Sequence, residues 1–304
     1  MAAIEVNQLS YRYGQVEALR DLALTVPEGA LYALLGPNGS GKTTLLQILT
    51  GLRRGYTGRA SLLGVESRAL GASDRTHIGY VAEGQPLPRW MRIDQLEAYL
   101  APLYPTWDVT LANDLRNRFD LDATRTIRTL SRGEHMKVAL LCALAPRPRL
   151  ILMDEPFTGM DALVKDELVR GLLESAGSEG WTVLLCSHDI GELELLADWV
   201  GFLDHGQMTL SEPMETLRRR FRRIEVMSDS GVPDVVMSED WLSVERSGKR
   251  LSFLLANADD DRLIALSARF GGAAQVDVRD ATLREVFVAL AKRGLAGKRQ
   301  EVEA

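Results

Sequence analysis

The sequence predicts an α/β fold: a largely parallel sheet covered by helices, an antiparallel side sheet, an inserted helical subdomain and a small α+β domain at the C-terminal end. Two observations predict it. Short apolar runs alternate with helical patterns over the first two-thirds of the chain, as in parallel strands joined by helices. After Pro213 the pattern changes to alternating strands that include a hairpin.

Strands of two kinds are expected in the first two-thirds of the chain. Continuously apolar runs, typical of strands buried on both faces, occupy residues 30–36, 149–155, 182–188 and 199–206. Residues 4–13 and 17–26 alternate between apolar and polar side chains, which suits an antiparallel side sheet. Between about residues 86 and 146 helical patterns follow one another, which predicts the inserted helical subdomain.

The C-terminal part has an organisation of its own. We expect strands at residues 222–228, 241–256 (a hairpin) and 273–280, and helices at 260–272 and 282–294. The last helix has capping-box spacing at Thr282 and Glu285. Its apolar residues Leu283, Val286, Phe287 and Leu290 fall on one face. We therefore divide the chain into residues 1–212 and a small domain with its own core, residues 213–304.

Composition limits the classes of function. The chain has 304 residues, of which 46% are hydrophobic and 26% charged, as in an ordinary soluble globular protein. Its formal net charge of −6 argues against a dedicated nucleic-acid binder, which usually carries a basic surplus. No nucleic-acid partner is therefore expected.

A glycine-rich loop carries the first chemical signal. Gly36, Gly41, Lys42 and Thr43 match the phosphate-loop pattern G-x-x-x-x-G-K-[ST], between an apolar strand and a helix. The glycines let backbone N–H groups turn toward phosphate oxygens, Lys42 reaches the β- and γ-phosphates, and the Thr43 hydroxyl helps to hold Mg²⁺. This context favours a phosphate cradle over an ordinary turn. The residues predicted to bind ATP here are Gly36, Pro37, Asn38, Gly39, Ser40, Gly41, Lys42, Thr43 and Thr44.

Two carboxylates follow a second apolar strand. Asp154 and Glu155 lie at its C-terminal end, where open α/β sheets bind ligands. Alone, such a pair is usually the start of a solvated loop. Beside a phosphate loop we expect Asp154 to hold Mg²⁺ and Glu155 to orient and polarise the attacking water.

The sequence LSRGE, Leu130 to Glu134, opens a helix shortly before this strand. It resembles the L-S-G-G-Q-like hallmark of the ATP-binding subunits of ABC transporters. Ser131 and Glu134 also have capping-box spacing, which explains Ser131 equally well. The resemblance covers about residues 2–212 and implies a P-loop NTPase core. It also implies that Ser131 and Gly133 face the γ-phosphate bound by a second subunit.

Three more positions match the family. The resemblance implies that Tyr13 stacks on adenine, that Asp161 lies in the loop that crosses between subunits, and that His188 contacts the γ-phosphate and the attacking water. Without the family, Tyr13 reads as a packing residue and His188 as an unremarkable loop residue.

Two positions depart from the family pattern. Glu83 stands where the family has glutamine, with Gln85 two residues further on, and Arg132 replaces the first glycine of L-S-G-G-Q. A carboxylate still suits Mg²⁺, so Glu83 remains a candidate metal ligand, although it adds a charge beside the γ-phosphate. Arg132 either contacts nucleotide or faces solvent.

Partner surfaces follow from the same resemblance. The region after Glu83 forms a groove for a short helix of the membrane subunit in the family, and Pro86, Leu87, Trp90 and Met91 supply apolar surface there. Packing inside the helical subdomain explains each of them equally well. The basic run Leu217–Arg223 reads first as a solvated helix or linker, and second as a contact for acidic lipid headgroups.

The resemblance implies an ATPase that binds MgATP, dimerises as a nucleotide sandwich and drives separate polytopic membrane (permease) subunits from the cytoplasmic face of the membrane. Because this chain carries one phosphate loop and one L-S-R-G-E sequence, the shared sites need two such chains, and we expect a homodimer. The C-terminal part is similar to extensions of drug, peptide or antibiotic exporter ATPases, which favours export. The alternatives are a soluble ABC ATPase that acts on ribosomes or DNA, and a low-turnover ATP-dependent regulatory module. The sequence has no long coiled-coil insertion or second ATPase domain, and Glu155 and His188 are present, which count against them.

Overall fold

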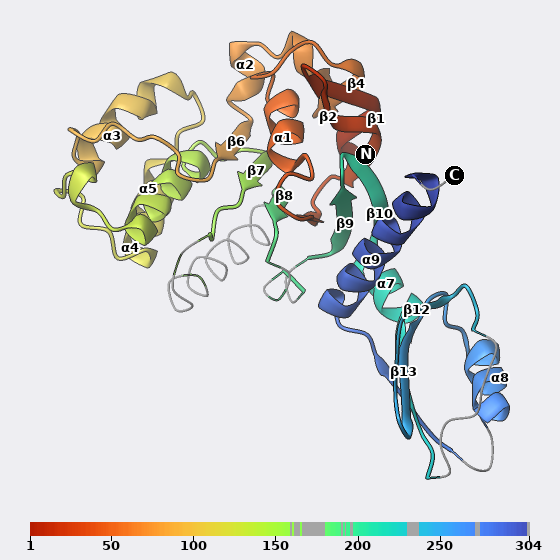
Figure 1. The fold of residues 1–304 in the computed structure, drawn as a ribbon. Coiled ribbons are helices and arrows are strands. Elements are labelled where there is room, and N and C mark those ends of the chain that lie inside the picture. Colours follow the sequence, from red (N-terminus) through yellow and green to blue (C-terminus); the bar gives the residue numbers. More distant parts are fainter. Residues whose placement is uncertain are drawn as a thin grey trace.

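The computed structural model describes residues 1–158, 160, 165, 180–189, 191, 193–194, 197–229, 237–270 and 274–302, with side chains of the last helix to residue 292. The main sheet has six strands (Figure 1). In spatial order they are β10 (Gln207–Pro213), β9 (Trp199–Asp204), β3 (Leu31–Leu35), β8 (Thr182–Ser187), β7 (Leu150–Asp154) and β6 (Ile78–Val81). The strands from β9 to β6 are parallel and only β10 is antiparallel. The prediction of buried parallel strands is confirmed.

The predicted antiparallel side sheet is also present. Its spatial order is β2 (Val16–Pro27), β1 (Ala2–Tyr13), β4 (Thr57–Leu62) and β5 (Val65–Glu66). The apolar side chains of β1 and β2 form one buried cluster with those of α1 (Lys42–Leu49) and with one face of the main sheet. The short helices η1 (Ser67–Ala69) and α2 (Ala72–Arg75) link β5 to β6.

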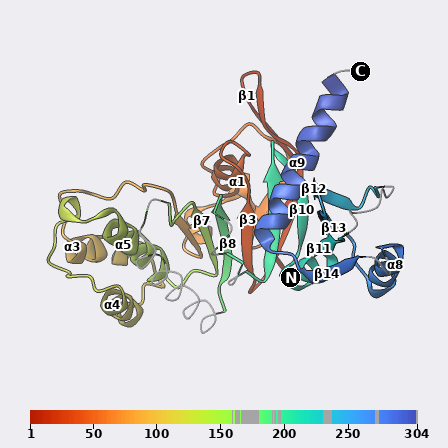
Figure 2. The ribbon, with the colours of Figure 1, turned by 60° about the horizontal axis from the view of Figure 1, so that its bottom comes forward.

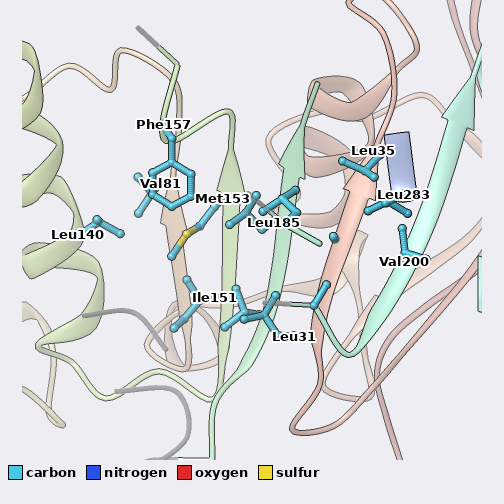
Figure 3. Close-up of a cluster of buried hydrophobic side chains, with 14 of the residues drawn as sticks. Leu31, Leu35, Val81, Leu140, Ile151, Met153, Phe157, Leu185, Val200 and Leu283 are labelled. Carbon is cyan, nitrogen blue, oxygen red and sulfur yellow. The ribbon is translucent and has the colours of Figure 1, made fainter. Parts of the chain in front are cut away.

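The helical subdomain lies at the β6 end of the main sheet, away from the C-terminal part (Figure 1). Its helices are α3 (Ile93–Leu100), η2 (Ala101–Leu103), α4 (Val109–Arg118), η3 (Ile127–Thr129) and α5 (Arg132–Leu144). The predicted run of helices is therefore confirmed. Its buried side chains belong to the cluster that lines the second face of the main sheet, where Leu140 of α5 lies near Val81 and Phe157 (Figure 3).

The C-terminal part has its own sheet and its own apolar cluster. After α7 (Met214–Arg220) come β11 (Arg222–Met227), β12 (Trp241–Ser247), β13 (Arg250–Leu255), α8 (Asp260–Phe270), β14 (Gln275–Asp280) and α9 (Leu283–Val302). The strands pair in the order β12-β13-β11-β14, all antiparallel. The Trp241 and Phe253 rings stack in this cluster with centroids 4.0 Å apart.

Helix α9 lies between the C-terminal sheet and the main sheet (Figures 1 and 2). Its apolar face packs in the cluster of the main sheet, and Leu283 lies near Leu35 and Val200 (Figure 3). The Phe287 ring lies 5.3 Å from that of Phe202 in β9. The predicted amphipathic helix is thus part of the core of the first two-thirds of the chain.

The basic run after Pro213 is paired with acidic side chains. Its ion pairs are Arg219 with Glu215, Arg220 with Glu212 at 3.1 Å, Arg222 with Asp280 at 2.7 Å and Arg223 with Glu285 at 3.8 Å. Arg218 donates to the carbonyl oxygen of Glu194 at 2.8 Å. Two of the partners, Glu212 and Glu194, lie in residues 1–212, so the run connects the two parts of the chain, which favours a structural role over contact with lipid headgroups.

Candidate active site

Four parallel strands bring the candidate residues to one edge of the main sheet. The phosphate loop follows β3, His188 follows β8, Asp154 ends β7, and Glu83 lies shortly after β6. The aligned residues at this edge are Leu35 with Ser187, Cys186 with Asp154, and Met153 with Val81. Because the strands end in register, residues far apart in the sequence face one region.

The phosphate loop has the predicted position between β3 and α1. A Cβ atom at Gly36 would lie 2.3 Å from the carbonyl oxygen of Leu203, and one at Gly41 would lie 2.7 Å from that of Ala18, so neither position admits a side chain. Gly41 has a φ of 111° and precedes α1 without a side-chain cap. The first N–H groups of α1 are therefore available to an anion.

Lys42, the first residue of α1, is only 5% exposed. Its ammonium donates to the carbonyl oxygens of Gly36 at 2.6 Å and Pro37 at 3.2 Å, and lies 3.2 Å from the Glu155 Oε1 atom. The Lys42 ammonium is thus held by hydrogen bonds to the phosphate loop and by an ion pair with Glu155, the predicted catalytic carboxylate.

Glu155 is the centre of a buried network. Its Oε2 atom lies 2.7 Å from the His188 Nδ1 atom and accepts a hydrogen bond from the His188 main-chain N–H at 3.3 Å. Thr158 donates its hydroxyl to the same oxygen at 3.4 Å. Glu155 also has a φ of 49°, a left-handed conformation that is uncommon for a residue other than glycine. The strained turn directs its carboxylate toward both Lys42 and His188.

Asp154 is 4% exposed, and burial raises the pKa of its carboxyl group. A hydrogen bond with the Thr43 side chain opposes this shift, whereas the charges of Glu155 and Glu83 add to it. The Asp154 Oδ1 atom is buried and has no hydrogen-bond partner. A divalent cation would satisfy this oxygen and offset the burial of its charge.

Mg²⁺ fits the donors at this position. The Asp154 carboxylate and the Thr43 hydroxyl are oxygen ligands, which Mg²⁺ prefers, and Mg²⁺ usually takes only one or two carboxylates beside substrate phosphates and water. Within the described ranges no three His, Cys, Asp or Glu side chains group as a metal site. The donor set therefore suits a nucleotide-bound metal rather than a cage made by protein alone.

A cavity of about 330 Å³ lies over the phosphate loop. The residues that line it are Tyr13, Val16, Glu17, Ala18, Asn38, Gly39, Ser40, Gly41, Lys42, Thr43, Thr44, Glu83 and Glu155. Tyr13 is 43% exposed; its hydroxyl lies 3.3 Å from the Thr44 hydroxyl, and the Arg53 guanidinium lies 4.6 Å from its ring centroid. The sequence analysis missed Val16, Glu17 and Ala18. Their one signal is that they begin the strand after Tyr13.

Ser131 and its neighbours line a second cavity, of about 270 Å³. Ser131 caps α5: it accepts from the Glu134 N–H at 3.2 Å, and its own N–H donates to the Glu134 carboxylate at 2.8 Å, which confirms the predicted capping box. Glu83 and Glu155 line both cavities, but the phosphate loop does not line this one. Gly133 follows in the first turn of α5. The predicted Asp161 lies outside the described residues.

Comparison with known proteins gives consistent matches. The family described as ABC transporter matches residues 19–158. YtrB, an ABC transporter ATP-binding protein of Bacillus subtilis, is 29% identical over 259 residues, which cover 85% of this chain and 88% of YtrB. The aliphatic sulfonates import ATP-binding protein SsuB of Mycobacterium avium is 36% identical over 222 residues, 71% of this chain and 83% of SsuB.

Two further matches extend this finding. The lantibiotic transport ATP-binding protein SrtF of Streptococcus pyogenes is 32% identical over 212 residues, 69% of this chain and 90% of SrtF. A solved ATP-binding subunit of an ABC transporter superposes with a TM-score of 0.65 at 26% identity, covering 71% of this chain and 92% of the other.

Proposed function

The chain belongs to the ABC transporter family as an ATP-binding subunit and ATPase, and we propose that two copies of it bind MgATP between them and drive separate membrane subunits. One observation carries this proposal. At one edge of the main sheet, beside the cavity over the phosphate loop, the structure brings together Lys42, Thr43, Asp154, Glu155 and His188. Each of these groups has a separate part in phosphoryl transfer to water.

Binding rests on the loop and on α1. The uncapped N–H groups of α1 and the loop amides donate to phosphate oxygens, and Lys42 turns from Glu155 toward the β- and γ-phosphates. Tyr13 offers its exposed ring to the adenine at the rim of the cavity. Thr43 and Asp154 would hold Mg²⁺, which would supply positive charge beside the phosphates.

Hydrolysis rests on Glu155 and His188. With Lys42 engaged by phosphate, the Glu155 carboxylate is free to accept a hydrogen bond from the attacking water and to polarise it. His188 holds the other oxygen of Glu155 at 2.7 Å and so fixes the direction of the carboxylate. His188 is 44% exposed and lines a separate cavity with Arg284 and Phe287, not the cavity over the phosphate loop. In this proposal its side chain turns toward the γ-phosphate when nucleotide is bound.

The second copy supplies Ser131 and the N-terminus of α5, which in each chain line a cavity separate from the phosphate loop. Ser131 caps α5 in a different cavity, so its helix N-terminus is available to a nucleotide bound by a partner chain. Size-exclusion chromatography of Glu155→Gln with and without MgATP tests this step. We expect a dimer only with MgATP, and a chain that is inactive yet always monomeric would contradict the sandwich.

A membrane subunit docks on the helical subdomain in this proposal. A cavity of about 250 Å³ there is lined by Pro86, Leu87 and Tyr99 among mostly apolar residues. Trp90 follows Pro86 and Leu87 in the sequence and is 77% exposed. Such a groove suits the apolar face of a short helix. Leu87 and Met91 also pack against the core of the main sheet. Co-purification of Trp90→Ala with a membrane subunit, compared with wild type, tests the surface; undiminished recovery would contradict it.

We propose export as the direction of transport and the cytoplasmic face of the membrane as the location. No helix in the part of the chain that the structure describes has the length and apolar composition of a membrane span. The match to YtrB covers 85% of the chain, so it includes part of residues 213–304, whereas the SsuB and SrtF matches cover 71% and 69% of the chain. Relatives named for import and for lantibiotic transport both occur, so transport assays in vesicles of both orientations decide the direction.

A further inference from the structure

The two positions that depart from the family pattern lie against each other. The Arg132 Nη2 atom lies 3.4 Å from the Glu83 Oε1 atom, with the side chains 56% and 50% exposed. Arg132 is the first residue of α5 and Glu83 belongs to the loop after β6, so the contact joins the helical subdomain to the main sheet. Glu83 places a carboxylate where the family has a neutral amide. It contacts the guanidinium of Arg132, which stands where the family has a glycine.

Gln85 does not take over the position of the missing glutamine. Its side-chain oxygen accepts a hydrogen bond from the Ala82 N–H at 3.2 Å, and it lines the apolar cavity of the helical subdomain. Glu83, in contrast, lines both the nucleotide cavity and the Ser131 cavity. The residue that faces the nucleotide is therefore the charged one.

Glu83 adds a third carboxylate to a site that must accept phosphates. Asp154 and Glu155 are already buried there, and the charge of Glu83 contributes to the raised pKa of Asp154. An uncompensated carboxylate at this position would repel the nucleotide and loosen the site. Arg132 is the cation that the structure places next to it.

Arg132 is itself in an unfavourable position without this partner. The N-terminus of a helix carries partial positive charge, which disfavours a cation in the first turn. Glu134, the acidic residue in that turn, is already engaged by Ser131 and Arg125. Glu83 adds negative charge at a phosphate site, and Arg132 adds positive charge at a helix N-terminus. Each charge is unfavourable alone, and in the ion pair each compensates the other.

We propose that Arg132 is a positioning residue for Glu83: it neutralises and orients this carboxylate at the nucleotide site, so that the pair replaces the neutral glutamine and glycine of the family. The inference rests on the proposed function for the identity of the ligand, MgATP. Because both side chains are about half exposed, the contact is weak, and its effect on nucleotide affinity is correspondingly small.

A double-mutant cycle tests the coupling. Arg132→Gly, Glu83→Gln and the double variant are compared with wild type for affinity toward Mg²⁺ with ADP and with a non-hydrolysable ATP analogue, by calorimetry. Arg132→Gly leaves Glu83 uncompensated, so we expect affinity to fall about two- to fivefold, the size of an exposed ion pair. The double variant should return to within about twofold of wild type, and Arg132→Lys should retain most of the affinity.

Two controls sharpen the cycle. Arg262→Gly breaks an ion pair of similar exposure, with Asp240 at 2.9 Å, in the C-terminal part and should leave nucleotide affinity unchanged. Thermal melts of every variant report folding. An equal loss from Arg132→Gly in the wild-type and the Glu83→Gln backgrounds would overturn the proposal, because Arg132 would then act without Glu83. A wild-type chain that binds no nucleotide would instead overturn the proposed function.

Discussion

Replacing Glu155 by glutamine should slow hydrolysis and strengthen nucleotide binding at the same time. The Lys42 ammonium lies 3.2 Å from the Glu155 carboxylate, with side chains 5% and 9% exposed. For Lys42 to serve a phosphate, this contact has to be given up. Glutamine keeps the shape of the side chain but removes the charge that competes with the phosphate for Lys42.

The two magnitudes follow from different contacts. The contact is a buried ion pair. Close charge pairs are coupled by about 1.5 kcal/mol or more, so removing the charge of this competitor should raise affinity for MgADP by about tenfold. Loss of the basic carboxylate that orients water should lower turnover by about 10²–10⁴-fold. His188→Ala is the matched control, because it disturbs Glu155 but leaves the contact between Lys42 and Glu155 in place.

Calorimetry with MgADP and a steady-state phosphate-release assay separate the two effects. We expect Glu155→Gln to bind MgADP more tightly than wild type and His188→Ala to bind it as wild type does. Unchanged or weaker binding by Glu155→Gln would refute the competition between carboxylate and phosphate. Turnover at the wild-type rate would remove Glu155 from the chemical step.

Three other changes test the site and the core. Lys42→Ala should abolish tight ATP binding in calorimetry, because it removes the buried cation that faces the phosphates. Burial raises the pKa of Asp154 above its ordinary value of 3.8. The neutral Asp154 carboxyl group therefore makes its full contribution to the stability of the fold below pH 3.8, and this contribution is lost as the pH rises through the raised pKa. Asp154→Asn without Mg²⁺ or nucleotide should therefore melt at a higher temperature than wild type at neutral pH, with a difference that narrows in acid; a lower melting temperature at neutral pH would contradict this. Leu283→Ala should cost about 2–5 kcal/mol in urea unfolding because Leu283 is 1% exposed, whereas Val288→Ala, at a 39% exposed position, should change stability by less than about 0.5 kcal/mol; equal effects would contradict the packing of α9 on the main sheet.

The sequence was informative where one short stretch carries the whole signal. The order strand, glycine-rich loop and helix around Lys42 is local, and so are the strand that ends at Asp154 and the capping box of Ser131. Apolar runs of the length of a strand also predict their own burial. These features depend on neighbours in the chain, which the sequence states directly.

Contacts between distant segments were beyond the sequence. Periodicity predicts which face of α9 is apolar but not that Leu283 and Phe287 pack on the main sheet. The pairing of Lys42 with Glu155 likewise depends on the strand order of the main sheet, in which β8 lies between β3 and β7. The sequence analysis treated the departures at two positions separately, because nothing local connects Glu83 with Arg132.

The charges of the site form a balance that nucleotide binding has to redistribute. Three carboxylates, those of Asp154, Glu155 and Glu83, belong to the site; Glu155 is paired with Lys42 and Glu83 with Arg132. The Asp154 Oδ1 and Glu155 Oε1 atoms are both buried without a hydrogen-bond partner among the described residues. The Glu155 atom has the Lys42 ammonium 3.2 Å away, and Asp154 is the carboxylate assigned to Mg²⁺. When phosphate takes Lys42, Glu155 loses its cation and becomes a stronger base toward water. Nucleotide binding therefore also activates Glu155, the carboxylate proposed to polarise the attacking water. Binding and catalysis are thus coupled through Lys42.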